Sequence, residues 1–300
     1  MHISLIAHGC PLPATSPAQW VPWWSFTKTV LASTALTLVR DGLLDLDEPL
    51  AEGPFSLRQL LRHEAGLADY SELADYHAAV ARHDPPWSAE SMLQRLDATR
   101  LRYEPGNGWR YSNVGYLYVV RLIERSTGLA LEQALQQRAF APLGLAQVRL
   151  ARTSADLQTV NMGSAARYHP GWVYHGLLVG PLGEAAVFLD CLLRGDLLPD
   201  DLLQQMQSVR VLGGPIPGRP WTAPGYALGL MQGPAEDGLL LSGHTGCGPG
   251  SVVAVYHCTQ GERTATCAVF ATDEQEGVVE AEVVRQLSAA VALGGSSGHA

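Results

Sequence analysis

The chain has 300 residues, enough for two structural units or for one large unit with an insertion. Apolar residues make up 47% and charged residues 16%, a composition that excludes a disordered or fibrous chain and is typical of a compact globule. The formal net charge is −9 and no basic stripe is visible, so the chain lacks the positive surface with which proteins attract nucleic acid.

Location and bound metals can also be judged from composition. No apolar run reaches the roughly 20 residues that cross a bilayer, and the first ten residues lack the features of a signal peptide. We therefore expect a cytoplasmic protein without membrane contact, although removal of a leader would make it periplasmic instead. The five scattered cysteines have no CxxC spacing, which indicates free thiols. We expect no metal site and no cofactor.

The first two thirds of the chain are predicted to be mainly helical. Residues 2–8 resemble a short strand, and apolar residues at helical spacing predict a helix over 25–41 that ends at Gly42. Ser56 and Gln59 have capping-box spacing at the start of the next helix. Further helices are expected over residues 89–97, 113–125, 129–140, 182–194 and 200–207.

The last third changes to strand patterns that should pair antiparallel. The predicted strands span residues 226–231, 238–242, 251–257 and 264–272. A closing helix follows over 280–293. Because strands stand at both ends of the chain, we predict an α+β fold: residues 1–44 and 208–300 form an antiparallel sheet flanked by N- and C-terminal helices. Residues 45–207 would be an inserted all-helical domain.

The chain's single lysine stands in a pattern that fits a nucleophile and its base. Of the 20 basic residues only Lys28 is a lysine, and it follows Ser25 by three positions on the first turn of a predicted helix, so the two side chains share one face. Lysine can lose its proton when it is desolvated, whereas arginine cannot. The helix N-terminus favours an oxyanion and disfavours the ammonium. The alternative is a chance pair left by a coding bias.

Two later motifs could complete such a site. Tyr111 and Asn113 are two residues apart in a predicted loop, where the phenol can pass a proton and the amide can orient a substrate. The Gly-rich segment 242–251 lies between two predicted strands, and His244 within it could relay a proton near neutral pH. The simpler alternatives are a core aromatic for Tyr111 and a surface histidine in a turn for His244.

Two other patterns carry less weight. Residues 294–298 fit G-x-S-x-G, but no strand precedes them and no helix follows, as a nucleophile elbow requires. Trp20, Trp23 and Trp24 precede Ser25 and could line a pocket, but core packing is the favoured interpretation.

In this order, the SxxK, YxN and HTG motifs resemble those of the serine β-lactamase and penicillin-binding-protein superfamily, in its class C and esterase branch. The resemblance covers about residues 20–290 and includes the connecting segments 43–50, 60–67 and 103–116. It implies a sheet domain and a helical domain with the active-site cleft between them.

The resemblance also implies roles for the matching residues. Three would be catalytic: Ser25 as the acylated nucleophile, Lys28 as its base and Tyr111 as the phenol that shuttles protons. Four would orient the substrate: Asn113, His244, Thr245 and Gly246. The backbone N–H groups of Ser25 and Cys247 would form the oxyanion hole, with the thiol of Cys247 a spectator.

One departure from the family pattern bears on the substrate. His244 stands where β-lactamases and many D-Ala-D-Ala peptidases carry a lysine, so the fixed charge for a substrate carboxylate is missing. We expect a serine hydrolase that forms an acyl-enzyme on Ser25 and hydrolyses small ester or amide molecules, esters preferred. The alternatives are a β-lactamase or D-amino-acid-specific peptidase or amidase, and a non-catalytic binding module. The sequence leaves the oligomeric state open.

Overall fold

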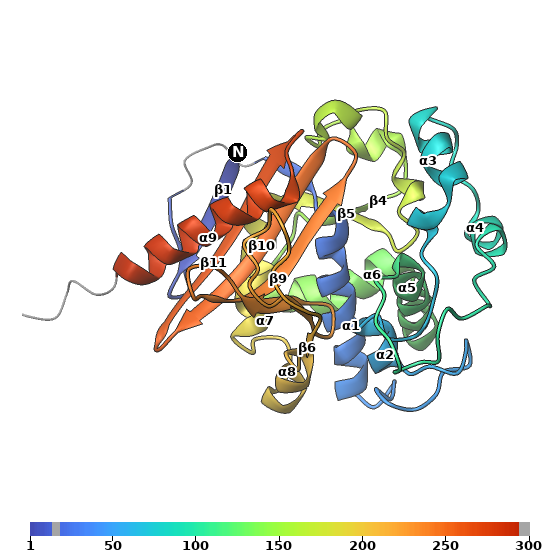
Figure 1. Ribbon diagram of the computed structural model, residues 1–300, viewed down its shortest axis with the longest axis horizontal. Coiled ribbons are helices and arrows are strands. Elements are labelled where there is room, and N and C mark those ends of the chain that lie inside the picture. Colours follow the sequence, from blue (N-terminus) through green and yellow to red (C-terminus); the bar gives the residue numbers. More distant parts are fainter. Residues whose placement is uncertain (14–18, 294–300) are drawn as a thin grey trace, which may run out of the picture.

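The computed structural model describes residues 1–13 and 19–293. The G-x-S-x-G segment at 294–298 lies outside the described residues. Within them, no helix has both the length and the apolar character needed to span a bilayer. In Figure 1 the large sheet lies on the left with α9 (Glu276–Leu293) in front of it, and α3 (Ala74–Ala81), α4 (Ala89–Arg95) and α5 (Asn113–Thr127) lie on the right. Helix α1 (Thr27–Arg40) runs between the strands and these three helices.

An eight-stranded antiparallel sheet confirms the predicted fold class. Its strand order is β2-β1-β11-β10-β9-β8-β7-β6, so the first strand of the chain pairs with the last one, as Figure 1 shows. The strands span β1 His2–Ala7, β2 Cys10–Pro11, β6 Arg210–Val211, β7 Gly225–Tyr226, β8 Met231–Pro234, β9 Leu240–Gly248, β10 Ser251–Gln260 and β11 Arg263–Thr272.

Helices cover both faces of this sheet, which explains why its central strands show no polar alternation. Residues 251–258 of β10 are all buried. Ala254 and Tyr256 pack in one apolar cluster with α9 (Glu276–Leu293). Val253 and Val255 belong to a second cluster with α1 and α7 (Leu182–Leu193). A strand buried on both faces reads as a continuous apolar run.

Most predicted helices are present within a few residues of their expected bounds. The further helices are α2 Leu57–Leu61, α3 Ala74–Ala81, α4 Ala89–Arg95, α5 Asn113–Thr127, α6 Leu131–Leu135 and α8 Asp200–Met206. The capping box at Ser56 and Gln59 forms both of its hydrogen bonds. Helix α6 continues as a π-helix to Phe140. The prediction missed α3 because only Ala79 on it is buried, so no apolar face marks it.

Residues 45–207 are not all helical, contrary to the prediction. Three strands form a second sheet in the order β3-β5-β4: β3 Trp20–Pro22, β4 Arg149–Ala151 and β5 Leu177–Pro181. Every residue of β5 is buried, so its short apolar run shows no alternation of apolar and polar residues. Its partners β3 and β4 are not adjacent to it in the sequence, so no hairpin pattern marked it as a strand. Helix α7 also packs on the large sheet rather than among the other helices. The division into two domains remains a prediction.

Two predicted strands near the end of the chain have different limits. The expected strand 226–231 is broken into β7 and β8 by a turn in which Gly229 has φ +76°. The HTG motif lies inside β9, not in a turn between strands. Strand β8 pairs with β9 only as far as Gly243, and beyond it β9 packs against the 3₁₀ turn Trp24–Phe26.

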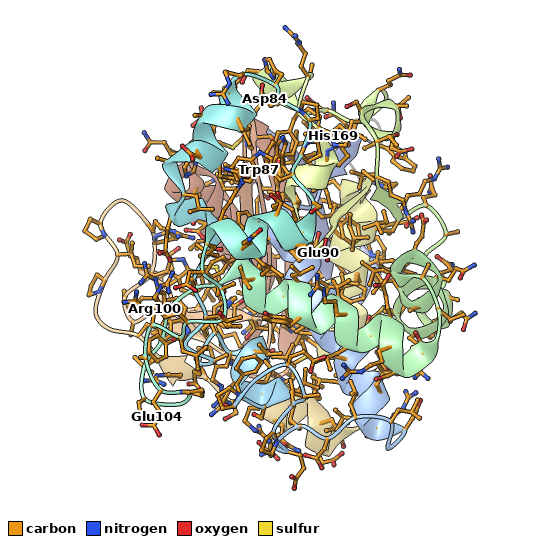
Figure 2. All side chains as sticks on the ribbon, turned by 90° about the vertical axis from the view of Figure 1, so that its right-hand side faces the viewer. Asp84, Trp87, Glu90, Arg100, Glu104 and His169 are labelled. Atoms are coloured by element: carbon orange, nitrogen blue, oxygen red, sulfur yellow. The ribbon has the colours of Figure 1, made fainter. Side chains whose placement is uncertain are left out.

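Aromatic packing joins the outer helices to the interior. Figure 2 labels Trp87 and Glu90 on the helical side of the molecule. The Trp87 ring lies 5.2 Å from that of Trp172, which in turn lies 5.5 Å from that of Tyr76. The Arg121–Glu90 ion pair on α4 and α5 is exposed, so it contributes little. This layer is therefore held by the aromatic contacts together with the buried cluster that includes Met92, Val114 and Leu117.

We expect Gly229→Ala to destabilise the protein more than Gly42→Ala. Both glycines have positive φ, which costs an alanine about 1–2 kcal/mol. A Cβ at Gly229 would also lie 2.3 Å from Cβ of Ala32, whereas one at Gly42 meets nothing within 4 Å. Overpacking of this kind adds about 1–3 kcal/mol. Urea unfolding of the two variants measures the difference, and equal midpoints would contradict the tight contact.

Candidate active site

Ser25 lies in a strained turn anchored by buried tryptophans. The 3₁₀ turn Trp24–Phe26 leads directly into α1, and Trp24 has φ +41°, a rare conformation for a bulky residue. Trp23 is fully buried, and Trp24 Nε1 donates to Ser251 Oγ at 3.0 Å. The prediction placed Ser25 in the α-helix. Ser25 and Lys28 are still one helical turn apart, because a 3₁₀-helix has three residues per turn.

Lys28 is completely buried beside Ser25. Its Nζ lies 3.2 Å from Ser25 Oγ and 5.0 Å from the centre of the Tyr111 ring. Burial lowers the pKa of Lys28 from 10.5 to about 7, against the opposing charge of Asp69. A neutral amine is therefore accessible near physiological pH, within hydrogen-bonding distance of a hydroxyl that needs a base.

Tyr111 is suited to donate a proton rather than to act as the base. It lies before α5 and lines the same cavity as Ser25. Burial raises the pKa of Tyr111 well above 10, and the Ser25 side chain opposes only part of that shift. The phenol keeps its proton near neutral pH, so between these two neighbours Lys28 is the group able to accept one.

Asn113 is held by a carboxylate that sequence reasoning missed. Asn113 begins α5, and its backbone N and side-chain Nδ2 donate to Asp69 at 2.9 and 3.2 Å. The amide oxygen of Asn113 accepts no hydrogen bond from any described residue, and Asn113 lines the cavity, so this oxygen is the atom that can face a substrate. The capping-box spacing of Asp69 and Glu72 was the one signal that marked this position in the sequence.

His244 is buried and neutral, which corrects both interpretations drawn from the sequence. Its Nδ1 donates to the Thr245 carbonyl at 2.7 Å, so Nε2 must accept the hydrogen bond from the Tyr226 hydroxyl at 2.9 Å. Burial, followed by the charge of Lys28, lowers the pKa of His244 to about 3. The ring is neither a surface histidine nor a group that exchanges protons near neutral pH.

Thr245 directs its hydroxyl into a buried network behind β9. The Thr245 hydroxyl lies 2.7 Å from that of Tyr256 and also donates to Glu280 of α9. Glu280 is fully buried and accepts from Arg219 Nε at 2.7 Å and Trp221 Nε1 at 3.2 Å. The network joins the closing helix to the strand that borders the site, so α9 takes part in placing the HTG motif.

Gly246 permits the contact between β9 and the Ser25 turn. An added Cβ would lie 2.7 Å from both Ser25 N and the Trp23 carbonyl oxygen, so only glycine fits. Cys247 follows Gly246 and lines the same two cavities as Ser25, so the backbone N–H groups of Ser25 and Cys247 are candidates to hold an oxyanion. Burial raises the pKa of the Cys247 thiol, which disfavours a thiolate there.

Two cavities meet at Ser25. The larger, of about 690 Å³, is bordered by the predicted residues Ser25, Tyr111, Asn113, His244, Thr245 and Cys247. Its charged lining residues are Asp69, Arg219 and Glu276, and Arg219 is already paired with Glu276 at 3.0 Å and with Glu280. The carboxylate of Asp69 is therefore in excess, which makes this cavity favourable for a cation.

The second cavity is smaller and largely aromatic. It has a volume of about 230 Å³ and shares Ser25, Ser71, Asn113 and Cys247 with the larger one. Its aromatic lining residues are Trp24, Tyr70, Tyr76, His77, Tyr168 and His175. A substrate held at Ser25 can thus place a polar part in one cavity and an apolar part in the other. In the part of the chain described, no cluster of His, Cys, Asp or Glu is arranged to hold a metal.

A protein-family model described as Beta-lactamase matches residues 13–292 of this chain. A D-aminopeptidase of Brucella anthropi is 29% identical over 222 residues, which are 72% of this chain and 41% of that protein. A lovastatin esterase of Penicillium rubens is 31% identical over 124 residues, 40% of this chain and 30% of the esterase. The chain thus spans less than half the length of either of these relatives.

A solved structure with the same fold covers almost the whole chain. The D-amino acid amidase from Ochrobactrum anthropi SV3, complexed with L-phenylalanine amide, superposes with a TM-score of 0.79 at 20% sequence identity. The match covers 98% of this chain and 94% of the amidase. The common fold therefore extends over nearly the whole chain.

We expect Lys28→Met to abolish turnover and yet stabilise the fold below about pH 7. Because the folded-state pKa of Lys28 is lowered from 10.5 to about 7, keeping the ammonium buried at lower pH costs up to about 5 kcal/mol relative to the unfolded chain. Between about pH 7 and 10 the unfolded chain binds more protons than the folded one, so the gain shrinks as the pH rises.

Urea unfolding near pH 6 and pH 9.5 measures this change. Lys28→Arg is the matched control, because its guanidinium remains charged at both pH values and should destabilise at both. If the Met variant is no more stable than the wild type near pH 6, the buried ammonium of Lys28 does not destabilise the folded protein.

Proposed function

The chain belongs to the beta-lactamase family, and from that premise we propose that it is a serine hydrolase that acts on small amides of amino acids with a free α-amino group. One observation carries the proposal: a fully buried lysine amine lies 3.2 Å from the hydroxyl of Ser25. The proposed reaction is acyl transfer through Ser25 to water.

Acylation would begin with proton transfer from Ser25 to neutral Lys28. The Ser25 oxygen then bonds to the substrate carbonyl carbon, and the oxyanion lies against the N–H groups of Ser25 and Cys247. Tyr111 gives its proton to the leaving nitrogen as the C–N bond breaks, and Lys28 returns a proton to Tyr111. Water attacks the acyl-enzyme with the same groups in reversed roles, which restores the Ser25 hydroxyl and releases the acid.

The charges of the larger cavity support a substrate that carries an ammonium group. The negative charge of Asp69 is not balanced by Arg219, because Arg219 is paired with Glu276. His244 is neutral and stands where β-lactamases carry a lysine that would meet the substrate carboxylate. A free α-amino group fits that potential, whereas the carboxylate of a β-lactam does not. The D-aminopeptidase and the D-amino acid amidase are relatives whose names describe substrates of this kind.

The smaller cavity supports an apolar side chain on the same substrate. Trp24, Tyr70, Tyr76 and Tyr168 offer ring faces and edges to an aliphatic or aromatic group. With the carbonyl at Ser25, the amino group toward Asp69 and the side chain in the aromatic cavity, the α-carbon is fixed at three points. A site that fixes three substituents discriminates between enantiomers. The names of the two relatives, D-aminopeptidase and D-amino acid amidase, support the D enantiomer as the substrate.

Ester hydrolysis is the second candidate, and it is the one that the sequence favoured. The lovastatin esterase supports it with 31% identity over 124 residues. An activated ester loses an alkoxide or phenoxide that needs less protonation than an amine, so it depends less on Tyr111. The two activities can therefore occur at one centre and still be separated by a variant.

We expect D-phenylalanine p-nitroanilide to be hydrolysed at least about 10²-fold more efficiently than its N-acetyl derivative, because acetylation removes the charge that faces Asp69. The L enantiomer and a chromogenic cephalosporin should be poorer substrates. Ser25→Ala is the inactive control. Equal kcat/KM for the free and acetylated amines would contradict the role of Asp69, and turnover of the cephalosporin alone would favour a β-lactamase.

We expect Tyr111→Phe to lower hydrolysis of the p-nitroanilide by about 10²-fold or more while lowering that of the matching p-nitrophenyl ester much less, because only the amine leaves with a proton. Equal losses of activity on both substrates would contradict the proton-donor role of Tyr111.

Labelling by a fluorophosphonate, followed by measurement of the intact mass, tests the non-catalytic alternative. A binding module would leave Ser25 unlabelled under conditions in which a control hydrolase reacts.

A further inference from the structure

Lys28 has a second polar neighbour that no motif indicated. Nε2 of His175 lies 3.2 Å from Lys28 Nζ, the same distance as Ser25 Oγ. His175 is only 2% exposed, and its buried Nδ1 has no hydrogen-bond partner among the residues that the structure describes. A buried imidazole in contact with the candidate base calls for a chemical role.

The backbone holds His175 against Lys28. Gly176 follows with φ +90° and donates from its N to the Val173 carbonyl at 2.8 Å, which closes a tight turn. Two residues further, Leu178 N donates to the hydroxyl of Thr27, the residue before Lys28. The segment that carries His175 is therefore tied to the first turn of α1, so the distance between the two side chains is set by the fold.

The tautomer of His175 decides what Lys28 can do. A neutral lysine has two N–H bonds and one lone pair. If Nε2 carried the proton, it would donate to that lone pair and leave no acceptor for the Ser25 hydroxyl. If Nδ1 carries the proton, Nε2 accepts from Lys28 and the lone pair is free for Ser25. Only the second arrangement is compatible with proton transfer from Ser25.

The surroundings keep His175 neutral, as this arrangement requires. Burial lowers the pKa of His175 well below its usual value, and the charge that Lys28 carries when protonated lowers it further. Asp69 acts in the opposite sense on Lys28. The ring centres of His175 and Tyr116 lie 6.5 Å apart.

We propose that His175 is a positioning residue whose Nε2 accepts a hydrogen bond from Lys28 and so directs the lysine lone pair to the Ser25 hydroxyl. The inference rests on the proposed function of Lys28 as the base. In acylation the Ser25 proton moves to that lone pair, and the resulting ammonium keeps its hydrogen bond to His175. The imidazole itself neither gains nor loses a proton.

The test compares His175→Leu, which has no acceptor, with His175→Gln, whose amide oxygen can take the place of Nε2. We expect the Leu variant to lose about 10²-fold in kcat/KM and in the rate of Ser25 labelling by a fluorophosphonate, and the Gln variant to recover most of both. Thermal unfolding of the two variants checks that both remain folded.

The pH profile separates positioning from mere packing. Removing an acceptor from the ammonium while keeping it buried should move the rising limb of kcat/KM to lower pH in the Leu variant. A cavity that admits water would move that limb upward toward the ordinary lysine value of 10.5. An upward shift, or a Gln variant no better than the Leu variant, would overturn the role of His175.

Labelling distinguishes this inference from the proposed function. If the wild type is labelled at Ser25 and the Leu variant is labelled at the same rate, the role of His175 fails and the nucleophile stands. If the wild type is neither labelled nor active on the amide and ester substrates, the proposed function fails and the inference fails with it.

Discussion

Burying the Lys28 side chain beside a serine hydroxyl is the constraint on which the rest of this site depends. An ammonium taken out of water is unfavourable by several kcal/mol unless it is paired or loses its proton. Here its hydrogen-bonding neighbours within the described residues are the neutral groups of Ser25 and His175, with the ring of Tyr111 close by. None of them neutralises the charge, and Asp69 acts only from a distance, so the environment favours the free amine.

That environment is assembled from segments far apart in the chain. The turn at Ser25 meets β9 through Gly246, and β5 reaches the same turn through Leu178, which accepts from Trp23 N at 2.8 Å. The closing helix then supports β9 through Glu280. Each contact is made by backbone atoms or by a fully buried side chain, so the geometry is held by rigid elements and not by a surface loop.

Charge and shape around this centre are the basis of the proposed substrate class. A neutral His244 and a paired Arg219 leave Asp69 as the uncompensated charge of the larger cavity, while the smaller cavity offers aromatic surface. The same acylation chemistry would serve a β-lactam, an ester or an amide, because the nucleophile and its base do not select among them. We therefore attribute the proposed selection to the residues that line the cavities, including His244 in place of lysine at the third motif.

The sequence by itself determined the fold class, most helices and the long strands, because apolar periodicity and caps such as Ser56 act over a few residues. It also placed Ser25 and Lys28 one turn apart. Only the tertiary structure decided that β3, β4 and β5 form a second sheet, that His244 is buried and neutral, and that Asp69 and His175 border the site. Those features arise from contacts between residues over a hundred positions apart in several cases, and such contacts leave no local pattern in the chain.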